Sequence, residues 1–233
     1  MGGSSRRGER TDRDEPVSKA VVSRLSLYLR ELQQLIRDGQ ETISSTQLGA
    51  LLGFTDAQVR KDLATFGQFG HPGIGYRCHE LIPVIRTILG TSESWRVALL
   101  GVGNLGRALV GYKGFRKQGF ELVAGFDLDP NQLETGEGQQ PSLGGGAEAI
   151  PIYPISELAT VVRQQGIRMA MLAVPAAAAQ SVADQAVAAG IDGILNFAPV
   201  TLNLPEHVRC IGVDLAIELE QLAFAVVNNA NKA

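Results

Sequence analysis

The sequence predicts an α/β protein of two domains, an N-terminal winged helix-turn-helix domain and a Rossmann-type parallel-sheet domain, followed by a C-terminal helix. Three observations predict this fold class. Two short helical segments, each with its own N-terminal cap, flank Gly53. A glycine-rich loop, Gly101–Gly106, stands between a buried strand and a helix. Strands and helices then alternate to about residue 213, which is typical of a mostly parallel sheet.

The composition is that of a globular chain that can bury a sizeable core. Of the 233 residues, 45% are hydrophobic and 19% are charged, and no apolar run reaches the roughly 18 residues that a membrane helix needs. Residues 1–16 have no apolar stretch, so we expect a disordered tail and not a secretory signal. Two distant cysteines, Cys78 and Cys210, favour a reduced, cytoplasmic setting over a disulfide framework or a zinc site.

The net charge of −3 conceals an asymmetry between the two parts of the chain. Residues 1–90 contain 12 basic and 10 acidic side chains, whereas residues 91–233 contain 9 and 14. This difference is within ordinary scatter and does not by itself identify a nucleic-acid partner. It does agree with a domain boundary near residue 90.

The first domain, residues 17–90, is expected to begin with an amphipathic helix. From about Ser18, apolar residues recur at three- and four-residue steps: Val21, Leu25, Tyr28, Leu29, Leu32, Leu35 and Ile36. The helix should end near Asp38–Gly39, where a glycine suits the C-terminal cap.

Two capping boxes of the S/T-x-x-Q type predict the next two helices. Ser44 pairs with Gln47 in one box and Thr55 with Gln58 in the other, and Gly53 supplies the turn between them. This spacing is that of a DNA-binding helix-turn-helix. An ordinary corner between two helices needs the same glycine and the same caps, so these residues alone leave both interpretations open.

The segment from Phe66 to Tyr76 alternates aromatic or apolar residues with four glycines. We expect it to form a short hairpin, the wing of a winged helix. A further helix is expected over about Cys78–Leu89, and the domain boundary then falls at Thr91–Ser94.

The second domain, residues 91–213, is expected to alternate strands and helices. The predicted strands are residues 95–100, 120–127, 167–174, 191–197 and 209–213. The predicted helices run from the glycine-rich loop to about residue 118, over residues 156–165 and over residues 176–189. Residues 128–149 are expected to form a loop, and a last helix with an apolar stripe should span Leu215 to about Val227.

The glycine-rich loop has the full sequence context of a dinucleotide-binding site. Gly101 permits the tight turn, Gly103 lets the backbone approach a pyrophosphate, and Gly106 lets the helix and strand pack closely. The helix N-terminus offers free N–H groups and a positive dipole end to the phosphates. Asp127, 21 residues beyond Gly106, would accept hydrogen bonds from an adenosine ribose and repel a 2′-phosphate, which favours NAD(H). The alternative is that the glycines serve packing alone and Asp127 caps a strand.

No catalytic set accompanies this site in the sequence. Two of the three histidines, His71 and His79, lie in the first domain, and the third is His207. Neither Tyr112 nor Tyr153 begins a Tyr-x-x-x-Lys pair, and no His, Cys, Asp and Glu cluster has metal-ligand spacing. A cofactor site without acid–base chemistry, joined to a helix-turn-helix, indicates a sensor and not an enzyme.

Several stretches of the sequence occur together as a specific set. They are Arg24-Leu25 with Tyr28-Leu29-Arg30, the QVRKDL run from Gln58 to Leu63, Phe66-Gly67, Gly73-Ile74-Gly75-Tyr76, the GVGNLG loop and the ILNFAP run from Ile194 to Pro199. This set resembles the Rex family of redox-sensing transcriptional repressors, bacterial winged-helix proteins that respond to the NADH/NAD⁺ ratio. The similarity extends from Val17 to about Asn228.

The resemblance implies a homodimer in which the nucleotide domains pair and the C-terminal segment, residues 214–233, is domain-swapped onto the partner. It implies that NADH releases the dimer from a palindromic double-stranded DNA operator, with no membrane and no metal involved. Half-sites one helical turn apart would suit two recognition helices in successive major grooves.

The resemblance also assigns residues to three roles. DNA contacts would come from a helix-turn-helix region from about Arg30 to Phe69 and from the wing, at Gln58, Arg60, Lys61, Gly73 and Tyr76. NADH or NAD⁺ would contact Gly101, Val102, Gly103, Asn104, Leu105, Gly106, Asp127, Ala173, Val174, Pro175, Asn196, Phe197, Ala198 and Pro199. The redox state would be relayed between domains by Arg30, Tyr112 and Asp214. Without the resemblance, Tyr112 would be interpreted as an amphipathic-helix residue and Asp214 as a helix cap.

One feature departs from the family pattern. Family members usually carry a basic residue just before the Gly-Val-Gly-Tyr of the wing, where this chain has His71-Pro72. The loss of one phosphate contact would flatten the salt dependence of DNA binding by about one unit of slope, unless Arg77 compensates. Cys78 and Cys210 are interpreted as isolated, semi-buried thiols in preference to oxidation sensors.

Three functions follow from these observations. The first is an NAD(H)-responsive repressor. The second is a small NAD-dependent oxidoreductase with an accessory helical domain, against which the missing acid–base residue argues. The third is a regulator whose dinucleotide is structural and need not discriminate between NADH and NAD⁺.

Overall fold

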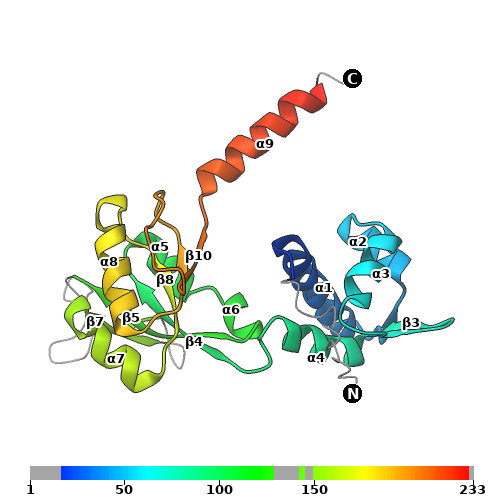
Figure 1. The fold of residues 1–233 in the computed structure, drawn as a ribbon, viewed down its shortest axis with the longest axis horizontal. Coiled ribbons are helices and arrows are strands. Elements are labelled where there is room, and N and C mark those ends of the chain that lie inside the picture. The colour runs from blue at the N-terminus through cyan, green and yellow to red at the C-terminus, as the bar shows by residue number, and fades with distance from the viewer. Residues whose placement is uncertain (1–16, 129–141, 145–148, 231–233) are drawn as a thin grey trace, which may run out of the picture. The chain divides into compact units, whose positions relative to one another are not determined.

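The computed structural model describes residues 17–128, 142–144 and 149–230 of the chain. The chain divides into two compact units, Met1–Ser92 and Glu93–Ala233, each with its own hydrophobic core (Figure 1). Over the residues described, no helix combines the length and the apolar character needed to cross a bilayer.

The N-terminal unit combines a set of helices with a small antiparallel sheet. Its elements are α1 (Lys19–Arg37), β1 (Thr42–Ile43), α2 (Ser45–Leu52), α3 (Asp56–Ala64), β2 (Gly70–His71), β3 (Gly75–Arg77) and α4 (Cys78–Ile88). Strand β3 lies between β1 and β2 and is antiparallel to both. The hairpin of β2 and β3 occurs where a wing is predicted. Strand β1 was not predicted, because two residues give no hydrophobic alternation.

The two short helices start at the predicted caps, but only the first capping box is complete. Ser44 Oγ accepts from the backbone N–H of Gln47 at 3.1 Å, and the Gln47 side chain accepts from the backbone N–H of Ser44 at 2.9 Å. Thr55 Oγ1 accepts from the backbone N–H of Gln58 at 3.1 Å. The prediction of a second full box is wrong, because the Gln58 amide donates to Asp62 instead, at 2.7 Å.

The turn between α2 and α3 depends on two glycines. Gly53 adopts φ +75° in the left-handed region, where a side chain would be strained. A Cβ on Gly49 would lie 2.5 Å from the carbonyl oxygen of Phe54, so only glycine lets the turn pack against α2. The predicted role of Gly53 in the turn agrees with this geometry.

A buried carboxylate joins α1 to α3 within the core of the N-terminal unit. Asp62 is 2% exposed and accepts two hydrogen bonds from Arg24, Nε to Oδ2 at 2.6 Å and Nη2 to Oδ1 at 2.8 Å. It also accepts from the Tyr28 hydroxyl at 2.9 Å. Burial alone would raise the pKa of the Asp62 carboxyl, but the hydrogen bonds from Arg24, Tyr28 and Gln58 outweigh burial, and the pKa lies below its usual value.

The C-terminal unit is built on a twisted sheet. Its strands are β4 (Trp95–Leu100), β5 (Phe120–Asp127), β6 (Ser142–Leu143), β7 (Ile150–Pro154), β8 (Met169–Leu172), β9 (Gly193–Asn196) and β10 (Arg209–Gly212). Their order across the sheet is β10-β9-β8-β4-β5-β7-β6. All neighbours are parallel except β6 and β7. The predicted, mostly parallel sheet is confirmed.

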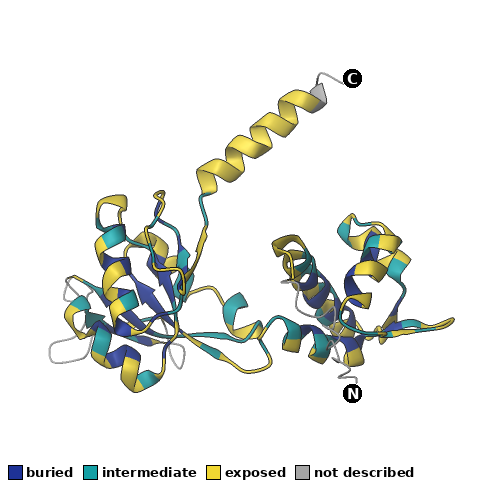
Figure 2. Cartoon of the chain, viewed as in Figure 1, coloured by how far each residue is buried: buried dark blue, intermediate teal, exposed yellow. Residues whose placement is uncertain are grey.

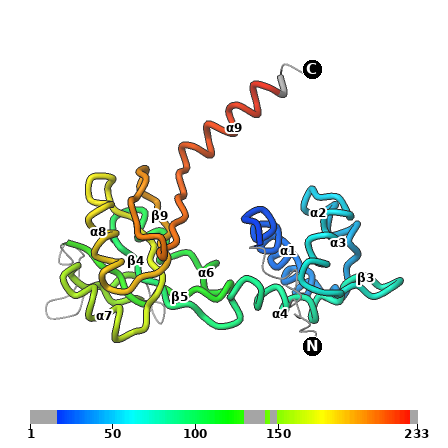
Figure 3. Tube along the Cα trace, viewed as in Figure 1, coloured from blue at the N-terminus to red at the C-terminus, as the bar shows by residue number. Residues whose placement is uncertain are grey.

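Helices cover both faces of this sheet (Figures 1 and 3). On one face, α7 (Leu158–Gln165) and the alanine-rich α8 (Ala176–Ala189) pack on a core that includes Leu100, Phe126 and Leu172. On the other face, residues of α5 (Asn104–Val110) and α6 (Gly114–Lys117) pack near Leu99 and Ile152. A six-residue strand such as β4 is therefore buried on both faces, which explains its continuous apolar sequence.

The structure corrects several predicted elements. The single helix expected to reach residue 118 is two helices, because the chain leaves the helical path at residues 111–113. The expected loop 128–149 contains the short β6, and residues 129–141 and 145–148 lie outside the described residues. Strand β7 was missed because its sequence, IPIYP, contains two prolines, which β-strand patterns disfavour. A 3₁₀ turn (Ile155–Glu157) precedes α7, and β8 and β9 are shorter than predicted.

The last helix, α9 (Leu215–Ala230), carries apolar side chains that the rest of the chain does not cover (Figure 2). Phe224 is 72% exposed, and the other exposed large apolar residues of α9 are Leu215, Ile217, Leu219, Leu222, Val226 and Val227. An exposed set of this kind is typical of a surface that binds another protein chain.

The ion pair between Arg24 and Asp62 should stabilise the N-terminal unit. In Arg24→Met, the buried carboxylate loses its cation, and we expect the free energy of unfolding of this unit to fall by about 3 kcal/mol at pH 7. Because the Asp62 pKa is lowered in the folded wild-type chain, the wild-type advantage is present above about pH 4 and is lost as pH falls further. Hydrogen exchange of α1 and α3 amides in the full chain, compared between wild type and Arg24→Met across this pH range, measures the loss of stability.

The matched control is Arg37→Met, which removes an exposed arginine from the same helix. Equal protection in both variants, or a difference that does not shrink below pH 4, would contradict the assignment.

Candidate functional site

The loop after β4 makes a sharp corner that contains three glycines, two of which are sterically required. Gly101 has φ +94°, and a Cβ on it would lie 2.5 Å from the carbonyl oxygen of Ala173. A Cβ on Gly106 would collide with the carbonyl oxygen of Gly101. Gly103 differs from both, because a Cβ there would meet no atom within 4 Å. The first and third glycines therefore serve close packing, whereas Gly103 leaves open space where α5 begins.

This corner lies at the switch point of the sheet. The chain proceeds from β4 to β5 and β7 on one side and through β8 and β9 to β10 on the other, so the loops after β4 and β8 diverge next to each other. A cavity of about 180 Å³ opens there. It is lined by Gly101, Gly103, Phe126, Asp127, Leu128, Ile155, Ala173, Val174, Pro175, Ala178 and Val182. The structure thus brings together six of the predicted cofactor residues.

Asp127 stands at the end of β5, where it was predicted. Its Oδ2 accepts from the backbone N–H of Val102 at 2.8 Å and its Oδ1 from the backbone N–H of Leu128 at 2.7 Å. The carboxylate is half-buried and also lines the cavity. Each oxygen keeps a lone pair that can accept from a ribose hydroxyl. Asp127 therefore positions the glycine-rich loop as well, a role that the sequence did not indicate.

The Asn196–Pro199 segment lines a second cavity, of about 320 Å³. Asn196, which is 3% exposed, accepts from the backbone N–H of Ala198 and donates to the carbonyl of Val200, both at 2.9 Å. Its amide therefore shapes the turn itself. Phe197 instead packs against the apolar core on the α5 side of the sheet. Of the remaining predicted cofactor residues, Asn104 and Leu105 are exposed at the start of α5.

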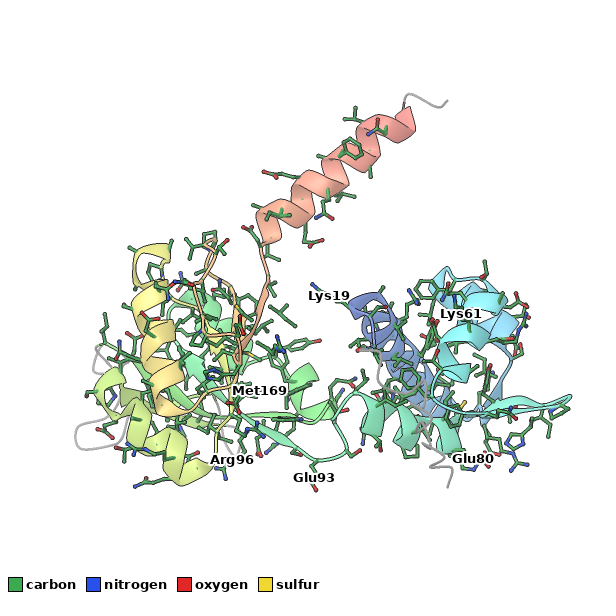
Figure 4. The ribbon with its side chains drawn as sticks, viewed as in Figure 1. Lys19, Lys61, Glu80, Glu93, Arg96 and Met169 are labelled. Atoms are coloured by element: carbon green, nitrogen blue, oxygen red, sulfur yellow. The ribbon has the colours of Figure 1, made fainter. Side chains whose placement is uncertain are left out.

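A larger cavity contains no predicted cofactor residue. It measures about 670 Å³ and lies near the amino ends of β4, β5 and β7. Basic and aromatic side chains line much of it: Arg96, Tyr112, Lys113, Phe115, Arg116, Lys117 and Phe120. Figure 4 labels Arg96 at this end of the sheet. The chemistry of a glycine-rich corner with an adjacent carboxylate, and not cavity size, locates the candidate dinucleotide site.

The three predicted relay residues occupy separate environments. Arg30 is exposed on α1 of the N-terminal unit. Tyr112 is 60% exposed in the turn between α5 and α6, and its ring meets Phe115 edge-on at 4.9 Å between centroids. The interpretation of Tyr112 as a helix residue is therefore wrong. Asp214 lines the 320 Å³ cavity and accepts from the backbone N–H of Ala216 at 2.9 Å, so it caps α9.

The α3 residues that are predicted to contact DNA differ in the exposure of their side chains and in their hydrogen bonds within the protein. Arg60 is 56% exposed, and its Nη1 contacts Asp56 at 2.6 Å and Ser45 Oγ at 3.2 Å. The Arg60 guanidinium lowers the pKa of the Asp56 carboxyl. Lys61 is exposed on α3 and is labelled in Figure 4. Gln58 is half-buried and directed at Asp62.

The wing carries a small charged cluster around Glu80. Gly73 turns the hairpin with φ +75°. His71 Nε2 lies 3.0 Å from one Glu80 oxygen, and Arg77 donates to the other at 3.0 Å. These contacts from His71 and Arg77 lower the pKa of the Glu80 carboxyl. The positive charge of Arg77 is thus already paired, and Tyr76, at 7% exposure, is part of the core.

Metal binding and thiol chemistry were also considered from the sequence. Across residues 17–128, 142–144 and 149–230, no group of three or more His, Cys, Asp or Glu side chains is arranged to hold a metal ion. Cys78 is buried and Cys210 is exposed. The prediction that both thiols are semi-buried is therefore wrong. Burial raises the pKa of the Cys78 thiol, which makes it a poor nucleophile.

Fold and sites together define a class: proteins that join a winged helix-turn-helix to a nucleotide-binding parallel sheet in one chain. Comparison with known proteins agrees. The family model for a putative DNA-binding protein N-terminus matches residues 16–64, and the model for a CoA binding domain matches residues 92–200.

Curated relatives match along nearly the whole chain. The redox-sensing transcriptional repressor Rex of Pelotomaculum thermopropionicum is 42% identical over 217 residues, which cover 93% of this chain and 97% of the relative. The protein of the same name from Streptomyces coelicolor is 42% identical and covers 91% of this chain and 78% of the relative.

Solved structures match to the same extent. The crystal structure of RSP in complex with β-NAD⁺ and operator DNA aligns with a TM-score of 0.81 at 32% identity, covering 93% of this chain and 95% of that one. RSP in complex with β-NADH aligns with a TM-score of 0.77 at 30% identity, covering 93% and 97%. This chain belongs to the Rex family of redox-sensing transcriptional repressors, as its sequence motifs predicted.

The glycine corner yields a test of which glycines pack and which face open space. In Gly106→Ala, the added methyl group meets the Gly101 carbonyl, and we expect the C-terminal unit to lose about 1–3 kcal/mol of stability. In Gly103→Ala, the methyl points into open space at φ −65°, which alanine adopts readily, so stability should not change. Thermal unfolding followed by the fluorescence of Trp95, the only tryptophan, measures both. Equal destabilisation by the two variants would contradict the assignment.

Proposed function

We propose that this protein is a DNA-binding transcriptional repressor that responds to the NADH/NAD⁺ ratio, and that NADH releases it from a palindromic operator. The observation that carries the proposal is the combination, in one chain, of a capped helix-turn-helix and a glycine corner beside Asp127. The Rex relatives described above, which match over 97% and 78% of their own lengths, support it.

The residues at the corner fit a dinucleotide. Open space at Gly103 and the N-terminus of α5 suit a pyrophosphate, and Asp127 faces the same cavity as an acceptor for ribose hydroxyls. Ala173, Val174 and Pro175, after β8, supply an apolar wall. When bound, the dinucleotide supplies a nicotinamide ring whose positive charge is lost on reduction.

The protein would distinguish NAD⁺ from NADH by the charge of the nicotinamide ring. An apolar wall disfavours the charged ring relative to the neutral one. Switching from mostly DNA-bound to mostly free needs the two cofactor forms to differ by about 5 kcal/mol in conformational preference. Arg30, Tyr112 and Asp214 are the proposed relay. Arg30 is exposed, and Tyr112 is largely exposed, so both side chains are available for changed contacts.

DNA would be read from α3 and the wing. Arg60 and Lys61 are exposed on α3 and would contact phosphates and base edges, with Gln58 beside them. Gly73 would let the wing backbone approach the duplex. Because Arg77 is paired with Glu80, it compensates poorly for the missing basic residue before the wing.

A regulatory role is favoured over the oxidoreductase alternative by the lining of the cofactor cavity. Asp127 is the one ionisable side chain among the residues that line the 180 Å³ cavity, and it already accepts two backbone hydrogen bonds. The 320 Å³ cavity at the Asn196–Pro199 segment adds Asp214, whose carboxylate already caps α9, and Glu218. A hydride-transferring enzyme needs a proton donor beside its substrate. The protein therefore acts as a sensor, and we place it in the cytoplasm.

Titration of DNA binding against the NADH/NAD⁺ ratio tests this function. We expect mobility shifts of a palindromic duplex with NAD⁺ and loss of the shifted complex as the NADH fraction rises. Asp127→Ala should blunt the release by NADH and leave DNA affinity nearly unchanged, because Asp127 lies in the C-terminal unit. Absence of DNA binding, or equal binding with either cofactor, would overturn the proposal.

The exposed apolar face of α9 supports the proposed homodimer, in which this helix packs on the partner. We expect Leu219→Glu with Leu222→Glu to convert a dimer to monomer in sedimentation analysis, because two charges would be buried at the contact. The control, Glu218→Gln with Glu220→Gln, changes charged positions of the same helix and should stay dimeric. A dimer that survives the leucine changes would show that α9 does not form the interface.

A further inference from the structure

Asp62, the buried carboxylate of α3, accepts a hydrogen bond from its own helix in addition to those from α1. Asp62 already receives a guanidinium and a phenol hydroxyl from α1. Its Oδ1 accepts a further hydrogen bond, from the Nε2 of Gln58 at 2.7 Å. Gln58 stands one helical turn before Asp62, so the two side chains share a face of α3. Asp62 is buried, whereas Gln58 is half-exposed at the boundary with the outer surface.

The chemistry of this contact determines how the Gln58 amide is oriented. An ionised carboxylate accepts hydrogen bonds and donates none, so the amide must present its nitrogen to Asp62. The Oε1 atom of Gln58 is repelled by the same carboxylate and turns away from it. One Nε2 hydrogen and both lone pairs of Oε1 remain free for a partner outside the protein.

The carboxylate is itself immobilised. Arg24 holds both of its oxygens with two hydrogen bonds, a geometry in which a carboxylate cannot rotate without breaking one of them. The Tyr28 hydroxyl donates a third hydrogen bond to the carboxylate, at Oδ2. The orientation of Gln58 is therefore imposed through Asp62 by two residues of α1.

We propose that Asp62 is a specificity-determining positioning residue, which fixes the Gln58 amide so that Oε1 faces the DNA as a hydrogen-bond acceptor. This inference rests on the proposed DNA binding through α3. In the major groove, an acceptor on the protein selects donors on base edges, which are adenine N6 and cytosine N4. A glutamine that is free to flip would discriminate less between these bases and the acceptors of guanine or thymine.

Selection from randomised operator duplexes tests the proposal with the full-length chain and NAD⁺. We expect the unsubstituted protein to prefer adenine or cytosine at one position by about tenfold. Gln58→Met, which keeps the length of the side chain but removes the amide, should lose the preference at that position alone. Asp62→Asn should relax the same position, because an asparagine can donate as well as accept.

Two readouts separate this role from a loss of folding. NADH affinity, which belongs to the other unit, should stay unchanged, and hydrogen exchange of α3 shows whether the N-terminal unit is folded. If Asp62→Asn unfolds, Arg24→Lys replaces it: lysine keeps the charge but not the planar fork that holds both oxygens, and the same position should relax to a smaller degree.

The outcomes distinguish the inference from the function on which it rests. If the unsubstituted chain selects no duplex, the proposed function fails. If it selects an operator, and Gln58→Met leaves every position unchanged, Gln58 reads no base and the inference is overturned. A second result would also overturn the inference. In it, Gln58→Met loses the base preference at one position, whereas Asp62→Asn and Arg24→Lys are folded and keep the full preference there.

Discussion

The close approach of backbone segments at the carboxyl edge of the sheet is the constraint on which the C-terminal unit depends. The Gly101 turn lies against the Ala173 carbonyl, and its own carbonyl lies against Gly106 at the start of α5. Asp127 closes the corner by accepting the Val102 N–H. The chain segments after β4 and β8 and the start of α5 thus approach backbone to backbone, and β5 joins the corner through the Asp127 side chain. The same packing that holds these elements together leaves open space at Gly103 and a carboxylate beside it, so the candidate cofactor site is a product of the fold.

A buried charge has the corresponding role in the N-terminal unit. Asp62 could not remain ionised at 2% exposure without the guanidinium of Arg24 and the hydroxyl of Tyr28. The ion pair therefore joins α1 to α3, the helix that carries Arg60 and Lys61, and it resists a change in the position of α3 relative to α1.

The sequence predicts the elements whose signals are local. The caps at Ser44 and Thr55, the positive-φ glycines and the apolar run of β4 each specify their structure from a few neighbouring residues. Strand β7 escaped prediction because two prolines obscure a pattern that only pairing with β5 makes favourable. The Asp62 network also escaped, since Arg24 lies 38 residues away and only folding brings the two together. One signal was available: Asp62 lies three residues after Val59 and directly before Leu63, so a charged residue stands on the apolar face of α3.

Coupling between the redox state of the dinucleotide and the occupancy of DNA in one chain has a thermodynamic consequence, which is that the effect is reciprocal. If NADH lowers the affinity for the operator, the operator must lower the affinity for NADH by the same factor. The measurement is the Kd of NADH, by fluorescence titration, with and without saturating operator duplex. We expect the duplex to weaken NADH binding by the factor by which NADH weakens DNA binding. An NADH Kd that is identical in the presence and absence of the duplex would contradict it.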